Sequence, residues 1–204
     1  MKRLTLVVFL MFVMMFGVMG GQVWGQDDIE YHLNRSKALY DKNDYFEAIN
    51  EANIVLKLNP NSVDAYYYRG IASDRVYYNK DRDATAEALS DYNMVIKLNK
   101  NYNSDVYLKR GDIYLIYERF RDYNKALSDF NTAIKLDPKN WLAYYSRGRL
   151  YRDMKKWDEA IADYFAALIN IDLKWINPND KGRGYYEEIS GALKFAIYYK
   201  RMSK

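Results

Sequence analysis

Apolar residues recur at spacings of three and four along most of the chain, a pattern that is typical of amphipathic helices. One phrase, Tyr-x-x-Arg-Gly, begins at Tyr66, Tyr107 and Tyr144, and a weaker copy begins at His32. Each copy is followed by a second helical pattern that contains an Ala followed by an aliphatic residue. These second patterns contain Ala48, Ala88, Ala126 and Ala160. The sequence therefore predicts four pairs of helices.

The predicted helices are separated by local stop signals. Asn59-Pro60 and Asp137-Pro138 end helices, because proline restricts the residue before it and cannot continue the hydrogen-bond ladder. Residues 41–44 form a short turn inside the first pair. We expect helix–turn–helix units at 29–62, 63–102, 104–140 and 141–174. A single unit cannot bury its apolar faces, so the units should stack around a continuous core.

A fifth amphipathic segment, residues 184–202, follows the last unit. It carries apolar residues at helical spacing, and we expect it to cap the exposed end of the core. The alternative is that this helix is free and lies on a membrane surface.

The four units resemble the tetratricopeptide repeat, a 34-residue helix–turn–helix. The fourth unit matches best, with its family positions filled by Tyr144, Gly148, Tyr151, Ala160, Tyr164 and Ala167. In each unit an Arg stands where the family has a Leu before the Gly. The resemblance implies an all-α, right-handed superhelical solenoid of four repeats with a C-terminal capping helix, and a scaffold that binds proteins without catalysis.

Small residues at Gly70, Gly111 and Gly148 should let the two helices of a unit approach closely. We expect the Ala of the second helix to face each Gly. His32 takes the aromatic position of the first unit, where a packing role is expected.

Each Arg of the repeated phrase recurs with an acid on the second helix of its unit. In an antiparallel helix pair these two positions should lie close together, which favours structural ion pairs over a catalytic arrangement. The expected pairs are Arg35–Glu51, Arg69–Asp91, Arg110–Asp129 and Arg147–Asp163.

In proteins that this chain resembles, the first helices line a concave groove. One predicted row of that groove is apolar, and its neighbour mixes charges, which suits an extended peptide or a partner helix. The alternative is that these residues only close a tight superhelix. The predicted groove residues are Leu33, Lys37 and Tyr40; Tyr67, Ile71 and Asp74; Leu108, Asp112 and Leu115; and Tyr145, Arg149 and Arg152.

Residues 1–25 have the basic start, short apolar core and small-residue end of a secretory signal peptide. Cleavage is expected before Gln26, and the alternative cleavage site follows Gly20. The protein is then exported, to the periplasm or the medium. The alternative is an uncleaved membrane anchor. The apolar run is shorter than the roughly 20 residues of a spanning helix.

The amino-acid composition of the chain excludes several kinds of chemical site. The chain has no Cys and one His, which excludes disulfides, thiolate metal sites and paired-histidine sites. The net charge of the chain is +4, and it falls to +2 without Lys2 and Arg3. The sequence has no dominant stripe of basic residues, so nucleic-acid binding is not expected. No phosphate-binding or hydrolase motif is present. We therefore expect no metal or cofactor. The resemblance and the predicted export together imply a protein or peptide partner in the cell envelope. The rival functions are a cell-envelope glycan binder and a regulatory subunit of an envelope enzyme.

Overall fold

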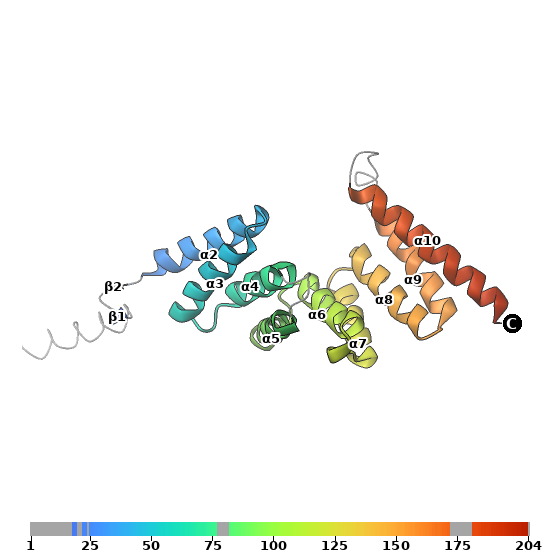
Figure 1. Ribbon diagram of the computed structural model, residues 1–204, viewed down its shortest axis with the longest axis horizontal. Helices are drawn as coiled ribbons and strands as arrows, with labels where there is room; N and C mark the ends of the chain where they lie inside the picture. The colour runs from blue at the N-terminus through green and yellow to red at the C-terminus, as the bar shows by residue number, and fades with distance from the viewer. Residues whose placement is uncertain (1–17, 20–21, 24, 77–81, 172–180, 204) are drawn as a thin grey trace, which may run out of the picture. The chain divides into compact units, whose positions relative to one another are not determined.

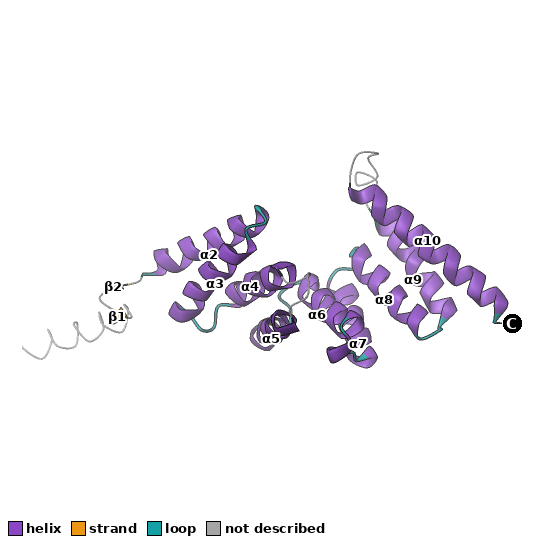
Figure 2. Ribbon diagram, in the orientation of Figure 1, coloured by secondary structure: helices purple, strands orange, loops and turns teal. Residues whose placement is uncertain are grey.

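The computed structural model describes residues 18–19, 22–23, 25–76, 82–171 and 181–203, and these residues are almost all helical (Figure 2). The only strands described are β1 (Val18–Met19) and β2 (Gln22–Val23), a two-residue antiparallel ladder. The predicted all-α class is confirmed. Most of the predicted signal peptide lies outside the described residues. None of the described helices combines the length and apolar character that crossing a bilayer requires.

The chain divides into two compact units, which we call unit 1 (residues 1–100) and unit 2 (residues 101–204). Unit 1 contains α2 (Gln26–Asp41), α3 (Tyr45–Leu58), α4 (Val63–Val76) and α5 (Arg82–Leu98) (Figure 1). Unit 2 contains α6 (Ser104–Ile116), the short 3-10 helix η1 (Glu118–Phe120), α7 (Tyr123–Leu136), α8 (Trp141–Asp153), α9 (Trp157–Asn170) and α10 (Lys181–Met202).

Local sequence explains where these helices start and stop. The helices α3 and α7 end immediately before Asn59-Pro60 and Asp137-Pro138. The side chain of Asn140 accepts a hydrogen bond from the backbone N–H of Ala143 at the start of α8, and Asn103 and Asp122 cap α6 and α7 in the same way. These caps satisfy backbone donors that the first turn of a helix leaves unpaired.

Each repeat is a pair of packed helices, and neighbouring pairs stack within each unit. In unit 1, α3 packs against both α2 and α4; in unit 2, α7 packs against α6 and α8, and α9 packs against α8 and α10. The helices α4, α6 and α8 begin at the first residues of the predicted second, third and fourth repeats. The helix α2 begins at Gln26, before the predicted start of its repeat, and α10 begins at Lys181, three residues before the predicted capping helix.

The glycines of the repeats lie against aromatic rings. A Cβ atom placed on Gly148 would come within 2.7 Å of the Tyr164 ring, and one on Gly111 within 2.6 Å of the Phe130 ring. The atoms nearest to an added Cβ belong to a buried aromatic ring about one turn after the repeated Ala, a contact that was not predicted. In the first repeat, Ser36 replaces the Gly and its hydroxyl donates a hydrogen bond to the carbonyl of Ala48.

Replacing Gly148 with Ala should destabilise the protein by about 1–3 kcal/mol, the usual cost of overpacking a core. The Tyr164 ring is fully buried, so it has no room to move away from an added methyl group. The matched control is Gly191→Ala on α10, where a Cβ atom meets nothing within 4 Å. There the better helix propensity of Ala should stabilise the protein by up to about 1 kcal/mol. Urea unfolding of both variants checks the opposite signs; equal shifts would contradict the packing.

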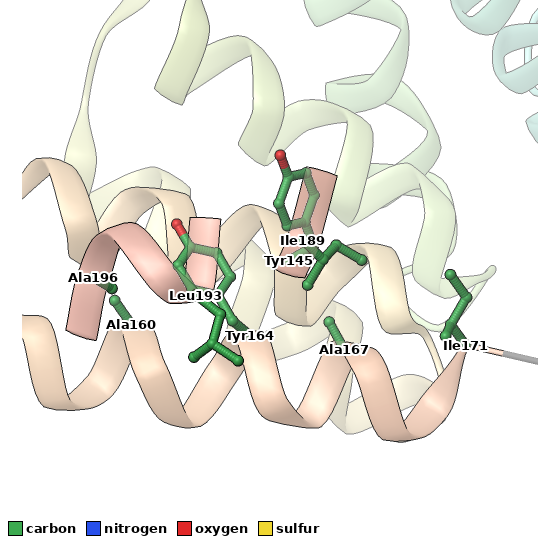
Figure 3. Packing of buried hydrophobic residues seen from close by; sticks show 8 residues of the cluster. All are labelled: Tyr145, Ala160, Tyr164, Ala167, Ile171, Ile189, Leu193 and Ala196. Atoms are coloured by element: carbon green, nitrogen blue, oxygen red, sulfur yellow. The ribbon is translucent and has the colours of Figure 1, made fainter. Parts of the chain in front are cut away.

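The helix α10 closes the core of unit 2. Its buried residues Ile189, Leu193 and Ala196 join a cluster with Ala160, Tyr164 and Ala167 of α9 and with Ile171, the residue after that helix (Figure 3). The helix thus takes the place of the first helix of another repeat, covering an apolar face that α9 would otherwise expose.

Candidate functional site

A pocket of about 330 Å³ lies in unit 2 between α8, the first helix of the fourth repeat, and α10. We call it the α8–α10 pocket. Its lining comprises Tyr145 and Arg152 from α8, and Glu188, Gly191, Ala192 and Phe195 from α10. Two of the predicted groove residues are therefore brought together here, beside four residues of α10 that were not predicted from the sequence.

Tyr145 is a buried residue of the pocket lining and joins α8 to α10. Its hydroxyl donates a hydrogen bond of 2.5 Å to Oε1 of Glu188, and its ring centroid lies 5.8 Å from the guanidinium carbon of Arg149. Burial and the Glu188 carboxylate both raise the pKa of Tyr145 well above its ordinary value. The phenol therefore stays protonated and continues to donate to Glu188, which holds α10 against α8.

The predicted groove residues of unit 2 divide into two groups. Leu108, Leu115 and Tyr145 are buried, with 2%, 4% and 7% of their surface exposed. Their side chains pack within the protein, as the alternative of a tightly closed superhelix expects. Asp112, Arg149 and Arg152 are half-buried and reach the surface. Arg152 forms an ion pair with its neighbour Asp153.

Unit 1 shows the same division. Ile71 is buried, whereas Leu33, Tyr67 and Asp74 are half-buried. Lys37 is exposed on α2, and the half-buried Tyr40 has its ring centroid 5.6 Å from that of Tyr45. The contact of these side chains with a partner stays a prediction. Within unit 1, the predicted residues that are not buried are Leu33, Lys37, Tyr40, Tyr67 and Asp74. Within unit 2, they are Asp112, Arg149 and Arg152, which lie in the same unit as α10.

The structure brings all four predicted Arg–acid pairs together. In the last three repeats the Arg binds the Asp through two parallel hydrogen bonds, from Nε and Nη2 to the two carboxylate oxygens. For Arg147 and Asp163 both distances are 2.7 Å. Each of these Arg side chains also lies over the Tyr three residues before it. Such a planar, bidentate contact is available to Arg and not to Lys.

In these pairs, burial disfavours the charged form of the acid, and the guanidinium group favours it. Burial raises the pKa of Asp91 and of Asp129, although the guanidinium groups of Arg69 and Arg110 act in the opposite direction. The hydrogen bonds to Asp163 raise the pKa of Arg147, which therefore stays charged. Removing one partner would leave a buried charge without compensation.

A third member of two of these clusters was not predicted from the sequence. Nη1 of Arg69 donates a hydrogen bond of 2.8 Å to Asn53, and Nη1 of Arg147 one of 2.6 Å to Asn131. In both cases the Asn lies on the second helix of the preceding repeat, so the Arg joins two repeats. The signal was present in the sequence, since Asn53, Asn93 and Asn131 each stand five residues after the repeated Ala, and Phe165 takes that place in the fourth repeat.

His32 contacts a buried acid in addition to packing in the aromatic position of the first repeat. Its Nδ1 lies 2.5 Å from Oε2 of Glu51, and Nε of Arg35 lies 3.0 Å from the other carboxylate oxygen. The first repeat thus shares its buried acid between an imidazole and a half-exposed guanidinium, where later repeats use one Arg.

Removing the hydroxyl of Tyr164 should increase the stability of the protein, whereas most substitutions in a protein core decrease it. Its hydroxyl is buried, and no hydrogen-bond partner lies within reach in the described part of the chain. Phe130 occupies the equivalent position in the third repeat and is also fully buried. Replacing Tyr164 with Phe should therefore stabilise the protein, by about 1 kcal/mol at neutral pH, because an unpaired buried hydroxyl is removed.

The same variant should change the response to alkaline pH. Burial raises the pKa of Tyr164 to about 12. A pKa that is higher in the folded than in the unfolded state contributes stability below about pH 10, which is lost as the pH rises towards 12. The advantage of Tyr164→Phe should therefore grow by roughly 1 kcal/mol between about pH 8 and 11. Urea unfolding at both pH values checks this; a constant or shrinking difference would contradict it.

Among the described residues, no group of three His, Asp or Glu side chains is placed to hold a metal ion. The titratable groups that converge in the repeats are the Arg–acid clusters, and these are already satisfied by one another.

The comparisons with known proteins agree with this architecture. The model of the family described as tetratricopeptide repeat matches residues 33–75 and 115–174, which together make up half of the chain. A tetratricopeptide repeat-containing protein of Methanocaldococcus jannaschii is 28% identical over 153 residues. The match covers 71% of this chain but only 25% of that protein, so the chain spans about a quarter of its relative's length.

Several solved structures share the fold. MamA superimposes with a TM-score of 0.65 at 17% identity, covering 87% of this chain and 91% of that one. TTC0263 of Thermus thermophilus gives 0.59 at 21% identity, covering 79% and 80%. The first repeat domain of Spaghetti (RPAP3), solved with an HSP90 peptide, gives 0.54 at 20% identity, covering 63% and 94%. The predicted repeat-solenoid class is thereby confirmed.

Proposed function

Because the chain belongs to the tetratricopeptide repeat family, we propose that it is an exported scaffold that binds another protein through the face formed by the first helices of its repeats. The fold is consistent with a protein–protein interaction scaffold. The observation that carries the proposal is the α8–α10 pocket, which is formed in part by α8, the first helix of the fourth repeat, and is lined by side chains of several chemical kinds.

The lining of the pocket suits a peptide segment. Ala192 and Phe195 offer an apolar wall for one side chain, while Arg152 offers donors and Glu188 an acceptor. A peptide backbone presents carbonyl oxygens and N–H groups to such partners, and an apolar side chain supplies the buried anchor from which most binding energy comes. The RPAP3 domain bound to an HSP90 peptide is a solved example of peptide binding on this fold.

Site-specific photocrosslinking tests the binding face. A photoreactive residue at position 152, on α8 in the pocket, should form an adduct with one defined protein in the native host. The matched control carries the same residue at Lys135, which lies at the end of α7, a second helix. Adducts of the same protein from both positions, or none from position 152, would contradict the proposed binding face.

Export rests on residues 1–25, whose basic, apolar and small-residue regions follow the order of a signal peptide. We propose a mature protein that begins at Gln26, the residue with which α2 starts, and that is periplasmic or secreted. The intact mass of the protein recovered from its host measures this. A mass corresponding to the chain from Gln26 is expected, and an intact N-terminal segment would contradict cleavage.

A further inference from the structure

The last helix carries an exposed apolar stripe in addition to the face that it packs against the core. Phe195, Tyr198, Tyr199 and Met202 have 45%, 57%, 42% and 69% of their surface exposed. Their spacing places them on one side of α10, and we call them the α10 stripe. The face that packs against α9 is a different one, formed by Ile189, Leu193 and Ala196. The helix therefore has two apolar faces, and only one of them serves the core.

Contacts with α9 hold the side chains of the α10 stripe in place. Trp157, at the start of α9, stacks on Tyr199 with ring centroids 5.6 Å apart and an angle of 21° between the rings. The ring centroids of Phe195 and Tyr199 lie 4.4 Å apart, and an ion pair joins Lys200 to Asp158. The exposed rings are thus held in place before any partner arrives, so binding costs little ordering entropy.

Positive charge surrounds this stripe. From Ile189 to the last residue the sequence contains four Lys and Arg residues and no acid. Lys194 and Arg201 stand seven residues apart, on the same side of the helix next to Tyr198, and both are exposed.

The neighbouring turn before α9 does not cancel that charge. It adds the exposed Lys155 and Lys156 beside Trp157. Of its acids, Asp158 is paired with Lys200 and Asp153 with Arg152, which leaves the exposed Glu159. One more acid, Glu188, lines the pocket beside Phe195. The surface around the stripe still has a net positive charge, because its six basic residues (Arg152, Lys155, Lys156, Lys194, Lys200 and Arg201) outnumber its four acids (Asp153, Asp158, Glu159 and Glu188).

We propose that the α10 stripe docks on a membrane surface that contains anionic lipids. Tyr and Trp rings favour the boundary between headgroups and acyl chains, and basic side chains beside them bind anionic headgroups. The stripe extends roughly 10 Å along the helix axis from Phe195 to Met202. This activity goes beyond the proposed binding of a protein in the α8–α10 pocket, with which the stripe shares Phe195.

The charge distribution favours lipid over a second copy of the chain. A symmetric pair formed through the same stripe would bring Lys194 and Arg201 of both copies together, with no acid within this part of either helix. Like charges at such a contact repel, whereas an anionic lipid surface neutralises them.

The absence of Cys makes a site-specific test possible in the full chain. An environment-sensitive fluorophore is attached to Tyr198→Cys, and a matched control carries it at Ile169→Cys, which is 81% exposed on α9. Vesicles that contain phosphatidylglycerol should raise the emission at position 198 severalfold and leave position 169 unchanged. Residues 1–25 are present in both labelled proteins, so any effect of that segment is common to positions 198 and 169.

Charge variants complete the test. Each basic residue near an anionic surface contributes about fivefold in affinity. Lys194→Gln and Arg201→Gln together should therefore weaken the affinity measured at position 198 on the order of 25-fold. An unresponsive probe at position 198, an equal response to pure phosphatidylcholine, or a response to protein concentration alone with a doubled mass would overturn the proposal. The last of these results would assign the stripe to a second copy.

Discussion

Replacing Ile189 with Asp should cost unit 2 more than about 4 kcal/mol, enough to unfold a repeat protein of ordinary stability. Ile189 is fully buried between α10 and α9. The substitution removes the apolar contact with α9 and places a carboxylate in an apolar cluster, where its charge is not compensated. Fluorescence of Trp141 and Trp157, both in unit 2, reports the loss during urea unfolding.

The control for Ile189→Asp is Tyr186→Asp, three residues earlier on α10 at a position that is 40% exposed. There the change should stay within about 1 kcal/mol. If both variants unfolded at the same urea concentration, or if Ile189→Asp resembled the wild type, α10 would not be closing the core of unit 2.

Replacing Arg147 with Leu should destabilise unit 2 by about 3 kcal/mol. The carboxylate of Asp163 is only slightly exposed and loses both hydrogen bonds from the guanidinium. Asn131, on the preceding repeat, loses its hydrogen bond as well. The loss therefore weakens the fourth repeat and its junction with the third, and urea unfolding followed by circular dichroism measures it.

Two further variants separate this mechanism from a loss of general stability. Arg35→Leu changes the same motif position in the first repeat, where the Arg side chain is 51% exposed and His32 also contacts the acid, so its effect should be much smaller. Asp163→Asn in the Arg147→Leu background should restore part of the stability, because a neutral amide replaces the buried charge. A harmless Arg147→Leu, or no recovery in the double variant, would argue against a buried ion pair.

The order and boundaries of the helices follow closely from the sequence. Asn59-Pro60 and Asp137-Pro138 end α3 and α7, and three helices begin where the repeats were expected to begin. These features depend on local backbone chemistry, in which a proline or a capping Asn acts on residues beside it. The Arg–acid pairs were equally predictable, because the motif repeats and the helix pair fixes which positions meet.

The candidate site was less predictable because distant segments complete it. The partner of Tyr145 is Glu188, 43 residues further along, on a helix that follows a segment outside the described residues. Spacing on α8 alone could place Tyr145 on the groove face, but could not show that α10 covers it. The burial of Ile71, Leu108 and Leu115 is likewise a matter of packing between helices.

The contacts of the repeated glycines needed packing information as well. Both an Ala and an aromatic ring of the second helix could have faced Gly148, and spacing does not distinguish them. The structure places the Tyr164 ring there, since the wide ring reaches the gap that a missing Cβ leaves. By contrast, the role of Asn131 could have been inferred from its recurrence in the repeats, once its position five residues after the Ala is noted.

A protein partner that binds in the α8–α10 pocket should lose affinity when a larger side chain fills the pocket. Gly191 lines the pocket and Gly184 lies earlier on the same helix; a Cβ atom at either meets nothing within 4 Å. The measurement is the affinity of the crosslinked partner for Gly191→Trp and Gly184→Trp by calorimetry. A loss of more than about tenfold, equivalent to about 1.4 kcal/mol, is expected for Gly191→Trp alone. Equal affinities for both variants and the wild type would contradict it.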